Sequence, residues 1–506
     1  MTAQDDLRAQ IDRQEHRLRR DVPADREAAT LALLRDLAAR SPSPMTSSGP
    51  DLITGRHIAG LGANKALQLC LESPAGDGSS RPNGEFTDWA ERFLRACGHL
   101  VEAEQVLAHC ETGFMRLVKQ EDGTFAAWIA TKRPPTIWRE RADIDWWASS
   151  LARQHVTELS RMMAYQLNYP LEAILGGCSV QTYCDVLGWL LRCAIQNGDH
   201  RAVSSWSEQS LIAKIAGDLR LDPEVIARAV EALTVERAGA AYHAAVPGVA
   251  AAPLVRLNAD RLVVSPFGVT TQPFFFLMRE LRRRDAEAYH NSAFLREQVF
   301  REDLYALFAD KRFVTSAGRI KLRRTDGDVR TDIDAAVFDR KTGTLGLFEL
   351  KSQDPFARST AELTRQRNNV LYANRQISGI LAWVQRYGAD ELLNRVDHRT
   401  AKTFRAHKVF PFVLGRYLVH FTDGPTPDRR AAWGTWPQLL RLLDGHEVSA
   451  KESNPLASLF IHLSNDVPLS QPIAENSLPA YDIPLGDRRL VVYPSYSAFQ
   501  ASATGP

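Results

Sequence analysis

The sequence lacks the features that would assign it to several common classes of protein. Its six cysteines show no Cys-x-x-Cys spacing and no histidines at zinc-finger intervals, so we expect reduced, buried thiols rather than a zinc module. No run of about 18 apolar residues is present, and the polar, acidic N-terminus differs from a signal peptide. We therefore expect a cytoplasmic protein with no membrane partner.

A strong net charge is also missing. The formal charge is only +2 over 506 residues, so the chain as a whole carries no nucleic-acid signature, and such binding must come from local patches. With 44% hydrophobic and 24% charged residues, the composition is ordinary for a globular protein with sizeable cores. The length predicts about three domains.

Composition and periodicity predict a multidomain α+β protein of four parts. Residues 1–205 are mainly helical, with a hairpin at 114–129, and are expected to recognise substrate, a partner protein or another copy of the chain in a homo-oligomer. Residues 206–290 form a winged-helix-like or structural module. Residues 291–425 carry the candidate chemistry, and residues 426–506 are a C-terminal extension.

The module at 206–290 is predicted from two short helices, a hairpin and a connecting helix, expected at 210–218, 222–233, 254–265 and 274–289. Asp222 is the expected cap of the second helix, with proline at the first helical position. DNA-reading helices usually expose Arg, Asn or Gln, whereas this helix exposes Glu224, Arg228 and Glu231. A structural or partner-binding role is therefore favoured.

The strongest chemical signal is a Glu-x-Lys sequence that follows an aspartate across a turn. Glu349 and Lys351 project from the same face of a strand because side chains alternate along it. Asp334 lies on the preceding strand-like run, and the polar turn at 339–343 folds that run back. The run 344–351 is apolar enough to be buried on both faces, where a charge is costly unless it has a partner or a metal.

This pattern resembles the PD-(D/E)xK nuclease superfamily, with the restriction-endonuclease-like fold, over about residues 291–425. The resemblance implies an α/β core in the order helix, three strands, helix, strand. It implies a metal-dependent nuclease that hydrolyses phosphodiester bonds, with DNA as the expected nucleic acid. Asp334, Glu349 and Leu350 would hold Mg²⁺, or Mn²⁺ in its place, and Lys351 would be the catalytic lysine.

A leading helix is predicted from Ala293 to Phe308. Many members of the superfamily carry a glutamate there, and Glu297 falls within the apolar arc of the helix, whereas Glu302 falls on the opposite side. Glu297 is therefore the catalytic candidate and Glu302 the weaker one. A first-turn glutamate also complements the helix dipole, so this alternative stays open for Glu297.

Two further residues are weaker candidates. Asp332 shares a strand face with Asp334 but lies nearer the start of the strand, which favours a supporting or substrate-facing role. Gln366 lies on a helix predicted at 361–387, where some relatives carry a glutamine near the metal. The superfamily's Gln-x-x-x-Tyr spacing is absent, so a solvated helix face is an alternative. The next strand is expected at 409–414.

Basic residues gather just before the site. Residues 311–330 contain seven Lys or Arg and two Asp, a local net charge of +5. The candidates for phosphate contact are Arg319, Lys321, Arg323 and Arg324. On the strand at 319–323, cations alternate with apolar residues, which also suits an edge strand protected from aggregation by its charge.

Two other functions remain consistent with the sequence. The chain could be a catalytically inactive interaction or regulatory protein of nuclease fold, in a defence or repair assembly, although an intact Asp334, Glu349 and Lys351 argues against decay. It could also cut only when a partner of such an assembly activates it.

Overall fold

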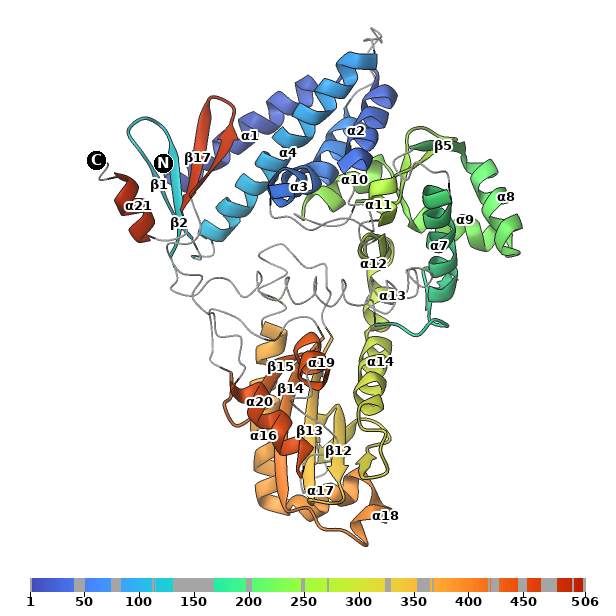
Figure 1. Cartoon of the computed structure of the whole chain (residues 1–506), viewed down its shortest axis with the longest axis vertical. Coiled ribbons are helices and arrows are strands. Elements are labelled where there is room, and N and C mark those ends of the chain that lie inside the picture. Colours follow the sequence, from blue (N-terminus) through green and yellow to red (C-terminus); the bar gives the residue numbers. More distant parts are fainter. Residues whose placement is uncertain are drawn as a thin grey trace.

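The computed structural model has mixed α+β architecture, with a mainly helical half and a sheet-containing half joined by a column of helices (Figure 1). The residues it describes are 2–40, 51–73, 83–111, 113, 115–130, 168–196, 203–246, 251–270, 273–323, 329–352, 365, 368–416, 419, 427–444, 453–465, 480–493 and 496–503. None of the helices in these ranges is both long enough and apolar enough to cross a membrane.

The N-terminal region is helical where it is described, as predicted. Its helices are α1 (Ala3–Asp21), α2 (Arg26–Arg40), α3 (Asp51–Glu72) and α4 (Asn83–Glu111). The first begins at Thr2, which forms a reciprocal capping box with Asp5. All four helices contribute buried side chains to one apolar core, in which Trp89 stacks on Phe93. This packing of apolar faces holds the region together.

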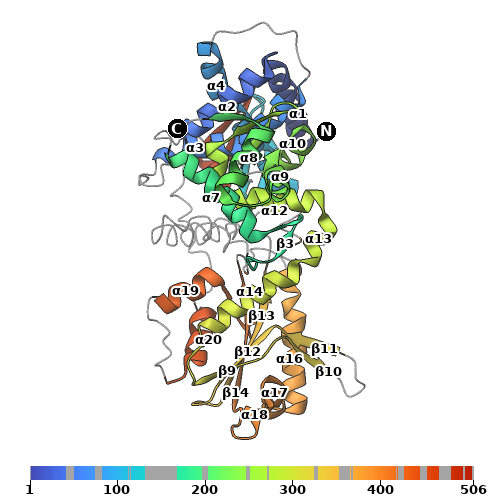
Figure 2. The same ribbon diagram turned by 90° about the vertical axis from the view of Figure 1, so that its right-hand side faces the viewer.

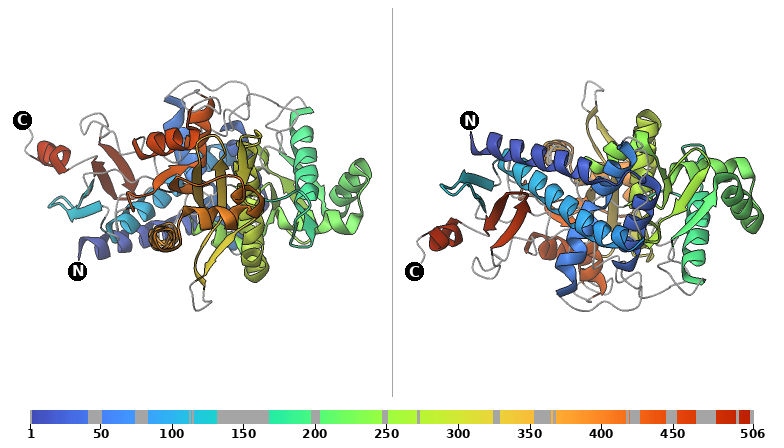
Figure 3. Two further views of the ribbon diagram at one scale, coloured as in Figure 1. Left: turned by 90° about the horizontal axis from the view of Figure 1, so that it is seen from below. Right: turned by 90° about the horizontal axis from the view of Figure 1, so that it is seen from above.

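The predicted hairpin at 114–129 is present and belongs to a larger sheet. Gly123, with a φ of +83°, lies in the turn of this hairpin. A second hairpin and a helix from the far end of the chain lie beside it, so the elements here are β1 (Met115–Lys119), β2 (Phe125–Ile129), β16 (Tyr481–Leu485), β17 (Arg488–Tyr493) and α21 (Tyr496–Ala503). The strand order is β1-β2-β17-β16, which brings the two ends of the chain to the same side of the molecule (Figure 3).

The middle of the chain contains the helices and hairpin predicted for the winged-helix-like module. In order, its elements are β3 (Ile174–Leu175), β4 (Cys178–Ser179), α7 (Val180–Gln196), β5 (Ser204–Ser207), α8 (Glu208–Leu219), α9 (Pro223–Ala232), β6 (Thr234–Val235), α10 (Arg237–Ala244), β7 (Leu254–Arg256), β8 (Arg261–Val264) and α11 (Pro266–Thr270). Asp222 caps α9 by accepting from the Glu224 amide, and Pro223 opens the helix, as predicted. Four strands form a sheet in the order β5-β8-β7-β6.

The helix predicted at 274–289 is two helices, α12 (Pro273–Arg284) and α13 (Ala286–Asn291). Asp285 interrupts it, because its side chain accepts a hydrogen bond from the Ala288 amide and so caps a new helix. Next comes α14 (Ala293–Ala306), the leading helix of the predicted core. Together the three helices run from the helical half to the sheet-containing half (Figures 1 and 2).

The second half is built on a five-stranded sheet in the order β15-β14-β13-β12-β9. Its strands are β9 (Phe313–Thr315), β12 (Ala335–Asp339), β13 (Thr344–Lys351), β14 (Lys408–Gly415) and β15 (Ala432–Thr435). β9, β12 and β13 are linked by antiparallel pairing, whereas β14 and β15 run parallel to β13. Gly343, with a φ of +62°, lies in the turn between β12 and β13 that the sequence predicted.

Helices cover both faces of this sheet. On β13, Leu345 and Leu347 pack toward one face and Phe348 and Leu350 toward the other, which confirms a strand buried on both sides. The covering helices are α16 (Ala373–Tyr387), α17 (Ala389–Val396) and α18 (His398–Ala401) beside the first face, and α14, α19 (Trp436–Asp444) and α20 (Pro455–Asn465) beside the second. Residues beyond 425, assigned from sequence to an extension, therefore supply part of this layer.

A two-stranded hairpin projects from the same half, formed by β10 (Ile320–Arg323) and β11 (Val329–Ile333) (Figure 2). Asp334 is the bend at which the chain leaves this hairpin and enters β12 of the main sheet. Such a break in a strand re-aims the side chain that sits on it. The position of Asp334 is therefore set by the junction of two sheets.

Candidate active site

Asp334, Glu349 and Lys351 meet on one face of the main sheet. Asp334 precedes β12, which pairs with β13 so that Ala335 lies opposite Phe348, and this register puts Asp334 across from Glu349. Glu349 and Lys351 share the face covered by α16, because side chains alternate along the strand. The sequence prediction that these three groups converge is confirmed, whereas their roles remain predictions.

Asp334 is held by the main chain of the neighbouring strand. Its side chain is almost fully buried, and its Oδ2 accepts a hydrogen bond of 2.8 Å from the Leu350 amide. Its own carbonyl accepts from Arg301 of α14 at 3.2 Å. These contacts fix the carboxylate before any ligand arrives, which is the kind of preorganisation that a metal or catalytic site needs.

Glu349 is buried with only part of its hydrogen-bonding capacity used. It is 2% exposed, and its Oε1 accepts from Lys351 Nζ at 2.6 Å, while its Oε2 accepts no hydrogen bond from the described residues. Burial, followed by the nearby charge of Asp334, raises the pKa of Glu349 to about 8. Two carboxyl groups buried together are costly to ionise, and a bound cation would stabilise their charged forms better than they stabilise each other.

Lys351 connects the strand to the helix that covers it. Its ammonium donates to Glu349 and also to Gln376 Oε1, at 2.8 Å, on α16. Gln376 occupies the place for which the sequence nominated Gln366, and Gln366 itself lies outside the described residues. Helical phase carried only a weak signal, because Gln376 lies at the edge of the stripe formed by the buried Ala373, Ile377 and Ile380 of the same helix.

The main chain after Lys351 is anchored by a residue that sequence reasoning missed. The Arg416 amide donates to the Lys351 carbonyl at 2.8 Å, and the Arg416 guanidinium forms a 2.8 Å ion pair with Asp303 of α14. That guanidinium is fully buried beside the rings of Phe300 and Trp436. A lone arginine after an apolar strand carried no sequence signal for this role.

Glu297 and Glu302 point in the directions that helical phase predicts. Glu297 is partly buried beside the site, and burial together with the charge of Asp334 raises its pKa. Glu302 is exposed and accepts from Gln298 of the same helix. The orientation of both side chains is confirmed, whereas the use of Glu297 in a reaction remains a prediction.

Arg319 lies among these carboxylates rather than on an outward-facing cationic surface. Its guanidinium contacts Glu297 at 2.7 Å, Asp334 at 3.1 Å and Asp332 at 3.3 Å. Asp332 therefore supports the cluster through Arg319, in line with its predicted supporting role. The positive charge of Arg319 was evident from sequence, but the direction of its side chain was not.

The remaining cations of the hairpin have the predicted alternation. Ile320 and Leu322 are buried, whereas Lys321 and Arg323 are exposed. The face is mixed in charge, because Lys321 lies opposite Asp332 in the strand register. Arg324 lies outside the described residues.

The groups present fit a hard divalent cation held by few protein ligands. Within the described ranges, no set of three or more His, Cys, Asp or Glu side chains could hold a metal ion alone. Mg²⁺ is commonly held by one or two carboxylates and keeps several waters, so two side-chain ligands, Asp334 and Glu349, would be enough for it. The Leu350 carbonyl points to the same strand edge as its amide, which faces Asp334.

We expect Glu297→Gln to raise the Mg²⁺ concentration needed for half-maximal cleavage, because it removes a carboxylate next to Asp334 and leaves Arg319 with fewer alternative partners. Glu302→Gln is the matched control on the same helix and should change little. Titration of cleavage rate against Mg²⁺ measures both. A larger effect of Glu302→Gln would reverse the assignment. If neither substitution had an effect, neither glutamate of α14 would take part in the reaction.

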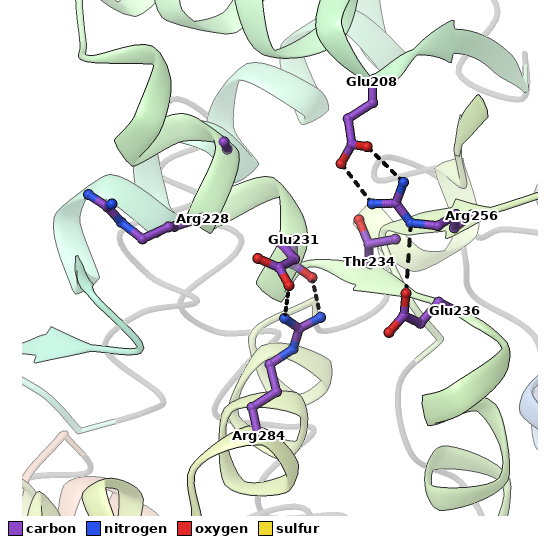
Figure 4. Close-up of a pocket in the computed structure, with 8 residues that line it drawn as sticks. Glu208, Arg228, Glu231, Thr234, Glu236, Arg256 and Arg284 are labelled. Atoms are coloured by element: carbon purple, nitrogen blue, oxygen red, sulfur yellow. Dashed lines mark hydrogen bonds and ion pairs between the residues drawn. The ribbon is translucent and has the colours of Figure 1, made fainter. Parts of the chain in front are cut away.

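A separate charged pocket of about 220 Å³ lies in the winged-helix-like module (Figure 4). Its arginines and glutamates are largely paired with each other: Arg256 contacts Glu208 and Glu236, and Arg284 contacts Glu231. Figure 4 shows Arg228 apart from both groups. The balanced charges favour a structural role for this pocket over binding of a charged ligand.

Comparison with known proteins adds no relative: no family model, curated protein or solved structure matches the chain.

Proposed function

We propose that this protein is a metal-dependent nuclease of the PD-(D/E)xK type, with Asp334, Glu349 and Lys351 as its reaction centre. One observation carries the proposal: a buried pair of carboxyl groups, Asp334 and Glu349, in which Glu349 Oε2 accepts no hydrogen bond from the described part of the chain and the Glu349 pKa is raised to about 8. Unfavourable arrangements of this kind are found at sites where a bound ligand relieves them. Groups with strongly shifted pKa values also concentrate at functional sites.

The element order supports the same proposal. Along the chain, α14 is followed by β9, β12 and β13, then by α16 and β14, with the β10–β11 hairpin inserted before Asp334. This matches the helix, three strands, helix, strand order that the resemblance implies. The candidate residues also lie at the carboxyl end of β13, where parallel β14 ends beside it.

Each residue has a distinct role in the proposed reaction. Asp334 and Glu349 would hold a divalent cation, which would supply a water of lowered pKa and neutralise charge on the phosphate. The Leu350 amide holds the Asp334 carboxylate in place by a hydrogen bond. Lys351, oriented by Glu349 and Gln376, donates a proton or a hydrogen bond to the oxygen that gains negative charge.

The substrate proposed is nucleic acid, with DNA first, because the hairpin next to the site exposes Lys321 and Arg323. Phosphate contacts from these two side chains would act on every sequence alike and would orient the backbone toward Asp334. Because the hairpin face is mixed in charge, few counterions would be released on binding, and the electrostatic contribution to affinity would be small.

We expect joint Lys321→Gln and Arg323→Gln substitution to weaken substrate binding for all sequences. The slope of log K against log salt should flatten by up to about 0.9 for each phosphate interaction removed on duplex DNA. Fluorescence anisotropy over a salt series measures it, and Lys341→Gln, on the exposed β12–β13 turn, is the control. An unchanged slope would indicate that the two cations do not contact phosphate and serve only to keep the edge hairpin soluble.

The function itself is tested by incubating purified protein with linear, circular and single-stranded DNA and with RNA, in Mg²⁺, Mn²⁺ or EDTA. Cleavage that requires the cation supports the proposal and identifies the substrate. Absence of both cleavage and cation binding would favour the alternative of an inactive interaction or regulatory protein. Cation binding without cleavage would point to an enzyme that a partner activates.

A further inference from the structure

Arg319 occupies the centre of the candidate site in a way that the proposed reaction does not explain. It directly precedes β10, at the base of the projecting hairpin, and its three carboxylate partners come from three places in the fold. Glu297 is on α14, Asp332 is on β11, and Asp334 is the bend before β12. One guanidinium therefore ties a helix, the hairpin and the sheet together.

The ion pair with Asp334 bears directly on cation binding. Asp334 Oδ2 accepts from the Leu350 amide at 2.8 Å, and Oδ1 lies 3.1 Å from Arg319 Nη2. Both oxygens thus have a partner. A divalent cation bound to Oδ1 would lie within a few ångströms of the guanidinium, and the two positive charges would repel each other in a partly buried site.

Arg319 would keep a carboxylate partner if its guanidinium moved off Asp334. Nη2 donates to both oxygens of Glu297, each at 2.7 Å, and this pairing does not depend on the contact with Asp334. The Arg319 side chain is 43% exposed, whereas that of Asp334 is only 3% exposed, so the arginine is the partner with room to move.

We propose that Arg319 is the internal counter-ion of the metal-free site and must leave Asp334 before a divalent cation binds. The inference rests on the proposed metal-dependent function and adds a control to it. Arg319 lowers the affinity of the site for metal in the absence of substrate. By the reciprocity of linked binding, an anion such as a nucleic-acid phosphate that draws Arg319 away from Asp334 strengthens metal binding, and metal strengthens binding of that anion.

The test is calorimetric titration of the full-length protein with Mn²⁺ alone, with no nucleic acid present. Arg319→Ala and Arg319→Gln should each bind Mn²⁺ about tenfold more tightly than the unsubstituted protein, or tighter still, because a competing positive charge has been removed. Lys341→Ala is the control, since it removes one exposed positive charge from the β12–β13 turn, away from the site. Its affinity should stay within about twofold, as expected of an exposed, screened charge.

The outcomes separate the inference from the proposed function. Equal or weaker Mn²⁺ binding by both Arg319 variants would overturn the inference while leaving the metal site in place. An equal gain for Lys341→Ala would also overturn it, because general electrostatics would then explain the effect. Undetectable Mn²⁺ binding by the unsubstituted protein and by every variant would remove the metal site, and with it the proposed function.

Discussion

Asp334→Ala and Glu349→Ala are each expected to abolish metal-dependent cleavage, with a fall of at least about 10³-fold in rate, because each removes one of only two proposed side-chain ligands. Metal binding should be lost in parallel. Asp334→Asn sharpens the test, since its amide oxygen can still accept from the Leu350 amide while its charge is gone. Single-turnover cleavage and Mn²⁺ calorimetry give the two readouts.

The same substitutions should not unfold the protein, and Glu349→Gln should stabilise its metal-free form. The folded-state pKa of Glu349 is raised to about 8, so the folded protein binds this proton more tightly than the unfolded chain does. The resulting contribution to the free energy of unfolding is fully present below the ordinary pKa of glutamate and is lost as pH rises toward 8. Glutamine cannot ionise, so its advantage should grow over that range to a few kcal/mol at most, on the order expected for such a shift. Denaturant unfolding at several pH values measures it.

Full activity of either alanine variant would show that the reaction centre lies elsewhere. Asp334→Ala removes a buried hydrogen bond, so a loss of cleavage in that variant could follow from loss of the fold. Glu349→Gln is expected to stay folded and therefore separates the two causes. Glu349 Oε2 accepts no hydrogen bond from the described residues, the glutamine oxygen can still accept from Lys351, and the glutamine NH₂ can donate toward Asp334 as the protonated carboxyl can.

Lys351→Ala is expected to reduce the cleavage rate by at least about 10²-fold while sparing metal binding, because the lysine stabilises charge or transfers a proton and does not hold the cation. Lys341→Ala removes an exposed lysine from the turn at the other end of β13 and should be silent. Gln376→Ala should have a smaller effect than Lys351→Ala, since it removes only one of the two hydrogen bonds that orient the ammonium.

Loss of metal binding in Lys351→Ala would contradict this division of roles. It would mean that the lysine shapes the carboxylate pair more than it serves the reaction. If Lys351→Ala instead matched the unsubstituted protein in both metal affinity and cleavage rate, the role of Lys351 would be only to neutralise Glu349.

Local pattern predicted much of the structure that positions the site. The apolar run at 344–351 became a strand buried on both faces, and the glycine of the preceding turn became Gly343 with its positive φ. The cap at Asp222 and the proline after it also marked the start of α9 correctly. These features depend on a few neighbouring residues, so the sequence carries them directly.

What sequence could not supply was set by contacts between distant segments. The pairing of β17 with β2 joins strands hundreds of residues apart, and no local signal announces it. The direction of the Arg319 side chain depends on carboxylates from α14 and β11, which only the fold brings together. Gln376 was missed because the superfamily pattern drew attention to an earlier glutamine, and because its contact with Lys351 joins a helix to a strand that lies far from it in the sequence.

Cleavage of DNA by the purified protein and by its Glu349→Gln variant, in Mg²⁺ and then in EDTA, tests the central claim most directly. We predict that the unsubstituted protein cuts only with Mg²⁺ and that the folded glutamine variant does not cut in either condition. Cutting that persists in EDTA, or equally fast cutting by the variant, would contradict a metal-dependent reaction centre at Asp334, Glu349 and Lys351.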